Sequence, residues 1–345
     1  MNKPDLKSMP LQELELFTQA LGEPKFRAKQ IFQWLHQKNI SDFDGMTTLS
    51  KPFREVLKEK TTISFAEKVE KIASSVDFTT KYLFQTENDY IIESVLMKYD
   101  YGNSVCVSSQ AGCRMGCAFC ASTIGGLERN LTAGEIAAQI YEIARDTDER
   151  VSHVVVMGCG EPLDNFDELL RFIQIINSPQ GANIGQRHIT VSTCGLADKM
   201  YRLADKELQI TLAVSLHAPN DDIRARLMPV AKTYDMGTLL AACNYYADKT
   251  KRRLTFEYAL IADVNDRREH ARELAEKLRG MLCHVNLIPV NPVAEHGFQK
   301  SEKETVERFA GVLKNAGIET TVRRRLGNDI NAACGQLRNQ YRGIK

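Results

Sequence analysis

The sequence lacks the features that would place the chain in a membrane or outside the cell. No uninterrupted apolar run is as long as a signal peptide or a membrane-spanning helix requires. The nine cysteines are an odd number and show no pattern of a disulfide framework. We therefore expect a cytoplasmic protein without membrane contact, whose thiols stay reduced and can act as metal ligands or nucleophiles.

The chain also lacks an excess of charge of either sign. Its 45 Lys and Arg residues balance 44 Asp and Glu residues, which leaves a formal net charge of +1. This balance excludes a uniformly basic surface, so any nucleic-acid contact has to be local. Hydrophobic residues make up 43% of the 345 residues, enough for the core of one large domain with a smaller one.

The spacing of apolar residues changes along the chain and divides it into four regions. Apolar residues at helical spacing predict a helical N-terminal accessory domain over residues 1–65. Short alternating runs predict an antiparallel β extension over residues 66–98. Over residues 99–330, β-rich runs alternate with longer helical segments, which predicts about six parallel βα units. The pattern alone fits an open or partial βα barrel and a doubly wound sheet equally well. A C-terminal segment, 331–345, follows.

Polar groups or glycines follow four of the predicted strands. Gly160 and Glu161 come after VVV, Ser192 after HITV, Ser215–His217 after TLAV, and Asn291 after NLIPV. Because the C-terminal ends of parallel strands converge on one mouth, we expect these groups to meet there. Taken alone, Ser192 would be a strand-end cap and His217 a satisfied core histidine. Their shared position favours a site.

Three cysteines stand together in QAGCRMGCAFCAST without a fourth nearby. Cys113, Cys117 and Cys120 are separated by four and three residues. Three thiolates suit a 4Fe-4S cluster in which the protein holds three irons and leaves one open. The alternative is zinc, closed by a fourth ligand from far along the chain. A zinc site more often shows a second CxxC or HxxxH pair, and this sequence has neither.

The CxxxCxxC motif, with Phe119 before its last cysteine, resembles the hallmark of radical S-adenosylmethionine (SAM) enzymes. The segments GGLERNLTAGEI, MGCGEPLDN, SLHAPND, NLIPVNP and INAACGQLR extend the resemblance over nearly the whole chain, to the RlmN/Cfr family of RNA methyltransferases. Cys159, Cys194 and Asn331 depart from the residues usual in that family, methionine, serine and aspartate. The resemblance implies a partial (β/α)6 TIM-like barrel of the radical SAM type, with a helical N-terminal domain and a short antiparallel extension.

The resemblance also implies the bound groups. Cys113, Cys117 and Cys120 would hold one 4Fe-4S cluster, and two molecules of SAM would be used per turnover. An external one-electron donor such as flavodoxin or ferredoxin would be needed. The residues implied to contact SAM are Gly160, Glu161, Ser192, Ser215, Leu216, His217 and Asn291.

The activity implied is methylation of C2 of a specific adenosine in 23S rRNA and of the adenosine 3′ to the anticodon in tRNA. Cys334 would carry the methyl group and become covalently joined to the RNA through it. Cys106 would release the RNA by forming a transient disulfide with Cys334, and Glu93 would accept the proton from C2. On sequence alone, Glu93 in YIIESVLM is equally well a solvent-facing carboxylate. The alternatives are Cfr-type C8 methylation and a zinc-stabilised RNA-binding protein without redox chemistry. A monomer is expected.

Two short basic groups are candidates for local RNA contact. Arg323–Arg325 lie close in sequence to Cys334, which favours contact with phosphate. Lys251–Arg253 more often form a solvated face. The N-terminal helical region, with its basic residues and the single Trp34, is expected to help hold folded RNA.

Overall fold

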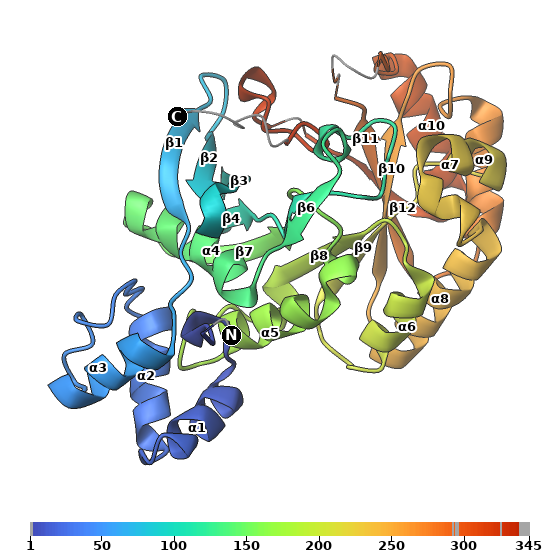
Figure 1. The fold of residues 1–345 in the computed structure, drawn as a ribbon. Helices are drawn as coiled ribbons and strands as arrows, with labels where there is room; N and C mark the ends of the chain where they lie inside the picture. The colour runs from blue at the N-terminus through green and yellow to red at the C-terminus, as the bar shows by residue number, and fades with distance from the viewer. Residues whose placement is uncertain (1–2, 292, 294–296, 325, 338–345) are drawn as a thin grey trace.

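The fold is built on a parallel sheet, seen in a computed structural model that describes residues 3–291, 293, 297–324 and 326–337 (Figure 1). Seven strands lie side by side in sequence order. They are β4 (Gly102–Cys106), β7 (Val151–Val156), β8 (Ile189–Thr193), β9 (Thr211–Ser215), β10 (Leu254–Leu260), β11 (Cys283–Pro289) and β12 (Glu319–Val322). Their apolar, β-branched runs are typical of strands buried on both faces.

Each step between neighbouring parallel strands passes through helix, as parallel pairing requires. The helices are α4 (Ala133–Thr147), α5 (Phe166–Asn177), α6 (Ala197–Ala204), α7 (Asp221–Leu227), α8 (Met236–Thr250), α9 (Arg268–Lys277) and α10 (Lys303–Asn315). They cover the outer face of a curved sheet (Figure 1). Within the described residues β12 has β11 as its strand partner and does not pair with β4, so the barrel is open. This confirms the predicted partial (β/α)6 barrel.

The antiparallel extension continues the same sheet. Strands β1 (Glu67–Ala73), β2 (Thr79–Gln85) and β3 (Ile91–Tyr99) pair in order and join β4, which makes ten strands in all. In this register Val95 lies opposite both Cys106 on β4 and Lys81 on β2. The meander therefore adds a wall to the barrel and is not a separate layer.

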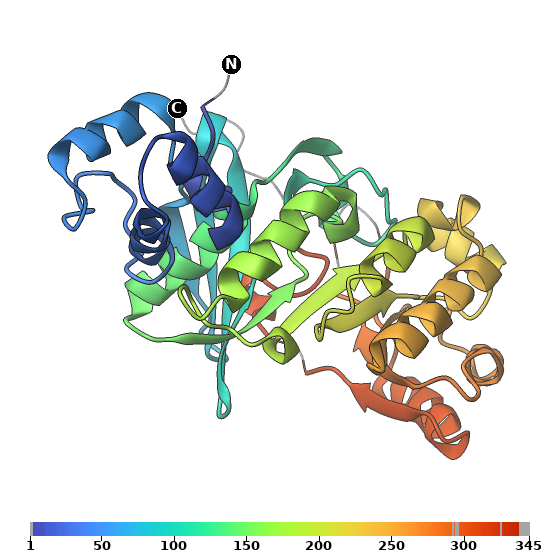
Figure 2. The ribbon, with the colours of Figure 1, turned by 90° about the horizontal axis from the view of Figure 1, so that it is seen from below.

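The N-terminal region is helical, as predicted. It contains α1 (Leu11–Ala20), α2 (Phe26–His36) and α3 (Lys51–Lys60), which lie outside the sheet beside α4 and α5 (Figure 2). The side chain of His36 bonds to the Tyr141 hydroxyl of α4 through Nδ1, at 3.0 Å. None of the helices in the described ranges is both long and apolar enough to cross a membrane.

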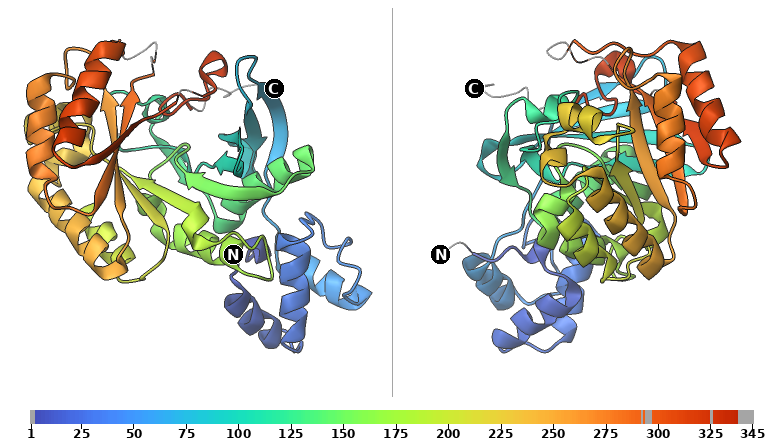
Figure 3. Two further views of the ribbon diagram at one scale, coloured as in Figure 1. Left: turned by 180° about the vertical axis from the view of Figure 1, so that it is seen from behind. Right: turned by 90° about the vertical axis from the view of Figure 1, so that its right-hand side faces the viewer.

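The segment after β12 returns across the barrel to the β1–β2 hairpin (Figure 3). The Asp329 carboxylate accepts hydrogen bonds from Ser74 and Ser75, and the Gly327 amide donates to Asp77 at 2.9 Å. This crossing carries Cys334 from one edge of the sheet to the wall formed by β3 and β4. Of the predicted C-terminal segment, residues 338–345 lie outside the described part of the chain.

Candidate functional site

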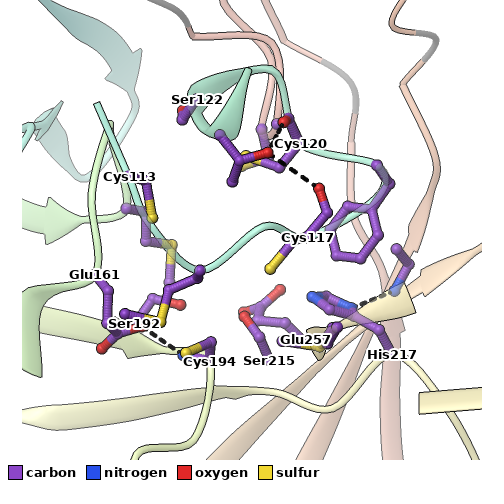
Figure 4. Close-up of a pocket in the computed structure, with 18 of the residues that line it drawn as sticks. Cys113, Cys117, Cys120, Ser122, Glu161, Ser192, Cys194, Ser215, His217 and Glu257 are labelled. Carbon is purple, nitrogen blue, oxygen red and sulfur yellow. Dashed lines mark hydrogen bonds between the residues drawn. The ribbon is translucent and has the colours of Figure 1, made fainter. Parts of the chain in front are cut away.

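One cavity lies at the C-terminal ends of the parallel strands, where the polar groups were expected to meet. Its lining comes from the cysteine loop and from strands β7 to β11 (Figure 4). The predicted site residues on it are Cys113, Cys117, Cys120, Gly160, Glu161, Ser192, Ser215, His217, Asn291 and Cys334. Strand ends far apart in sequence thus face one space.

The cysteine loop is held by backbone contacts on two sides. It connects β5 (Gln110–Gly112) and β6 (Leu127–Asn130), and its Ala118 and Ala121 amides donate to Leu227 and Gly335 at 2.8 Å each. Burial raises the pKa of the Cys113 thiol to about 12. Within the described ranges, no three His, Cys, Asp or Glu side chains are placed to share a single metal ion. Three thiols that each bind a separate iron need no such convergence.

The Glu161 carboxylate is buried and held in place by the backbone. Its two oxygens accept hydrogen bonds from the amides of Leu163, at 3.0 Å, and Cys194, at 2.7 Å. Burial raises the pKa of this carboxyl, while the bond from Cys194 acts in the opposite direction. A buried carboxylate with room beside it can accept charge-assisted hydrogen bonds from an ammonium ligand.

Gly160 is fixed by both its backbone and its surroundings. Its φ is +110°, and a Cβ there would lie 2.7 Å from the Cβ of Gln110. We expect Gly160→Ala to lower the free energy of unfolding by about 2 kcal/mol or more, because strained φ and close contact add. Urea unfolding measures this. Gly311→Ala in α10, where a Cβ meets nothing within 4 Å, is the control; an equal loss there would contradict the explanation.

His217 is both a cavity residue and a satisfied buried histidine. Its Nδ1 accepts a hydrogen bond from the Ala259 amide at 2.9 Å, and burial lowers its pKa to about 3. The neutral ring therefore has its other nitrogen available as a donor, and Phe119 packs edge-on against it. Leu216 differs from its neighbours, because its side chain lies in the main hydrophobic core. Leu216 is not among the residues that line the cavity, and its backbone N–H donates to the Glu257 carbonyl at 3.0 Å, so only its carbonyl is left to contact a ligand.

Asn291 lines the cavity next to Cys334. Its amide nitrogen donates to the Cys334 carbonyl at 3.1 Å. Its amide oxygen is buried and has no hydrogen-bond partner among the residues that the structure describes. A buried acceptor without a partner is costly, so this oxygen points to a ligand donor that completes the site.

Cys106 and Cys334 share a second cavity that adjoins the first. Both are free thiols. Burial raises the pKa of Cys106 to about 12, and the Arg323 guanidinium acts in the opposite direction. Arg323 lines both cavities and pairs with Glu257 at 3.9 Å. Arg323 is thus held towards the cavities, whereas Arg324 is exposed, and phosphate contact by the 323–325 group stays a prediction. Arg325 lies outside the described residues.

Glu93 is not the solvent-facing carboxylate that the sequence left open. Its side chain is 3% exposed and lies 3.5 Å from the ammonium of Lys81. The Ser108 hydroxyl donates to the Glu93 carbonyl at 2.6 Å, which ties β3 to the segment leading into the cysteine loop. Glu93 does not line the cavity at the strand ends. It contributes to a small recess beside Gln110 and Cys159.

Sequence reasoning missed buried charged residues around the site, among them Lys81, Glu257 and Arg224. Lys81 and Glu257 are charges inside apolar strands, KYLF and LTFEYALI, and that interruption was the available signal. Arg224 is completely buried and donates to the Cys194 carbonyl at 2.8 Å. The predicted basic faces are partly neutralised, since Arg253 forms an ion pair with Glu319.

Comparison with known proteins identifies the family. The model for the ribosomal RNA large subunit methyltransferase N-terminal domain matches residues 4–63, and the radical SAM superfamily model matches 107–275. A probable dual-specificity RNA methyltransferase RlmN from Alkaliphilus oremlandii is 55% identical over 341 residues, covering 99% of each chain. The chain belongs to the RlmN family of radical SAM proteins. Another RlmN relative, from Thermoanaerobacter sp. strain X514, is 52% identical over 98% of each chain.

The fold agrees with this membership. The crystal structure of a radical SAM methyltransferase from Sphaerobacter thermophilus is 45% identical, with a TM-score of 0.92 over 98% of this chain and 100% of that chain. Membership of the RlmN family implies a 4Fe-4S cluster and SAM. The residues fit these groups: three loop thiols face a cavity that also contains the Glu161 carboxylate and the unpartnered oxygen of Asn291.

Proposed function

We propose that this protein is an RNA adenine methyltransferase of the RlmN type, acting on C2 of an adenosine in 23S rRNA and of the adenosine 3′ to the anticodon in tRNA. The observation that carries the proposal is the presence of two adjoining cavities, one lined by the cysteine loop and one by Cys106 and Cys334 together. The dual-specificity RNA methyltransferase names of the full-length relatives support the RNA substrates.

The first cavity would hold the radical-generating groups. Cys113, Cys117 and Cys120 would each ligate one iron of the cluster. The residues proposed to hold SAM are Gly160, Glu161, Ser192, Ser215, His217 and Asn291, which line this cavity. The backbone carbonyl of Leu216, between Ser215 and His217, is proposed as a further contact. When bound, the cluster and SAM supply a 5′-deoxyadenosyl radical. Two SAM molecules per turnover are needed, because one supplies the methyl group and the other the radical.

The second cavity would carry out the transfer. Carbon 2 of adenine is electron-poor and does not attack a methyl donor, so the methyl group is first placed on the Cys334 sulfur. Removal of a hydrogen atom from that methyl group gives a carbon radical that adds to C2 and joins RNA to protein. The adduct then has to lose one electron before release, and the cluster held by the loop cysteines would accept it when bound.

Release needs a base and a thiol. The Glu93 carboxylate takes the C2 proton, and the electron pair of that C–H bond stays on the adenine ring. Cys106 then attacks the Cys334 sulfur: an S–S bond forms, the S–C bond breaks, and its electron pair remains with the carbon, which takes a proton to become methyl. Two electrons from a donor such as flavodoxin or ferredoxin reduce the disulfide. We propose that a cytoplasmic monomer performs this cycle.

The product identifies the reaction. Anaerobically purified protein, with SAM and a reductant, should convert unmodified 23S rRNA and tRNA to RNA that yields 2-methyladenosine on digestion, detected by mass spectrometry. The protein should be brown and contain iron and sulfide in equal amounts. Production of 8-methyladenosine alone would show Cfr-type chemistry, and a colourless protein with bound zinc would favour the RNA-binding alternative.

A further inference from the structure

A buried ion pair lies on the concave wall of the barrel, next to the thiol proposed to resolve the adduct. Side chains of one strand alternate between faces, so Lys81 on β2 points inward, whereas its neighbour Tyr82 bonds from the other face to Asp146 on α4. Lys81 is 6% exposed, and its ammonium lies 3.5 Å from the Glu93 carboxylate. Both members are therefore withdrawn from water.

The strand register places this pair beside Cys106. Lys81, Val95 and Cys106 form one row across β2, β3 and β4, because Val95 lies opposite each of the other two. Glu93 is two residues along β3 from Val95, so it shares the inner face and is the diagonal neighbour of both Lys81 and Cys106. Diagonal neighbours lie about 7–8 Å apart, within reach of long side chains.

Such a pair needs a reason other than stability. Removing two charges from water costs several kcal/mol per ion, and apolar replacements are often as stable. The chemistry proposed above supplies a reason, because a base has to be ionised to accept a proton. Burial alone favours the neutral acid form of a carboxyl group, whereas a cation within about 4–6 Å favours the carboxylate.

We infer that Lys81 is a positioning residue for the release of methylated RNA: its buried ammonium holds Glu93 as a carboxylate, oriented on the wall that carries Cys106. The inference rests on the proposed function, specifically on Glu93 as acceptor of the C2 proton. In the proton transfer, the carboxylate gains the C2 proton and becomes neutral, and the C–H electron pair stays on the adenine. Lys81 itself forms and breaks no covalent bond.

The inference predicts a particular failure for Lys81→Met. Steps before proton transfer should proceed, so Cys334 is still methylated and SAM is still cleaved. Release of methylated RNA should fall roughly 100-fold or more, the usual contribution of a positioned base. The covalent RNA–protein adduct should accumulate instead, as a band on a denaturing gel that resists reductant because its C–S bond is a thioether. Lys81→Arg, which keeps the cation, should release product far faster than Lys81→Met.

Three comparisons make the test decisive. Lys98→Met removes the cation of an exposed pair between Lys98 on β3 and Glu149 in the loop before β7, and it should trap no adduct. Lys81→Gln replaces Lys81→Met if the latter does not fold, as judged by circular dichroism. Glu93→Gln should trap the adduct by itself. Suppose that Glu93→Gln traps the adduct. The Lys81 inference is then wrong if a folded Lys81→Met variant releases product normally, or if that variant is inactive because Cys334 is not methylated. If Glu93→Gln releases product normally, the proposed role of Glu93 fails first.

Discussion

Replacing Cys334 by alanine should abolish RNA methylation and leave no covalent RNA adduct, whereas Cys106→Ala should trap RNA on the protein. The reason is the order of the two thiols in the proposed cycle. Cys334 carries the carbon that reaches the base, so its loss removes every later step. Cys106 acts only after the adduct exists, so its loss stops release. Radiolabelled tRNA on a denaturing gel, with mass spectrometry of the nucleosides, distinguishes these outcomes.

The matched control for the two thiols is Cys283→Ala. Cys283 is a half-buried cysteine at the start of β11 and lines neither cavity in the described part of the chain. This variant should methylate RNA at the rate of the unmodified protein. Methylation by Cys334→Ala would overturn the mechanism, because a carbon carried on another residue, or transferred directly from SAM, would then be required.

Most of the barrel could be predicted from the sequence, because parallel βα units repeat a simple pattern of apolar strand and amphipathic helix. The pattern could not decide between an open barrel and a doubly wound sheet. That choice depends on which strands pair, and pairing is non-local. The strand register that places Val95 opposite Cys106 and Lys81 is also non-local. It could not be predicted from the sequence, because it depends on how β2, β3 and β4 pair.

The candidate site was predictable where polar residues follow strand ends, as with Glu161, Ser192 and Asn291. It was not predictable where a residue's role depends on its partner. Arg323 belongs to a basic run, which indicated phosphate contact, yet its side chain pairs inward with Glu257. By sequence Glu93 could have faced solvent, and only the structure shows that its carboxylate is buried and lies beside Lys81. Residue type suggests chemistry, but burial and partners determine which chemistry is available.

Loss of one motif cysteine should abolish both the cluster and the reaction. In Cys117→Ala, only two thiols of the loop remain for three irons, so we expect iron and sulfide to fall to a small fraction of the wild-type content and the brown colour to disappear. SAM cleavage to 5′-deoxyadenosine should become undetectable. Anaerobic iron and sulfide assays, with chromatography of the cleavage product, measure these changes.

Cys194→Ser is the matched control, because Cys194 lines the same cavity and is buried, but it lies outside the CxxxCxxC motif. If the open position of the cluster is left for SAM, this variant should keep its iron and sulfide and should still cleave SAM. If instead Cys194 closed a four-thiol zinc site with the loop cysteines, its replacement would release metal as completely as Cys117→Ala, and the metal released would be zinc. The comparison therefore tests directly why the loop supplies three cysteines and not four.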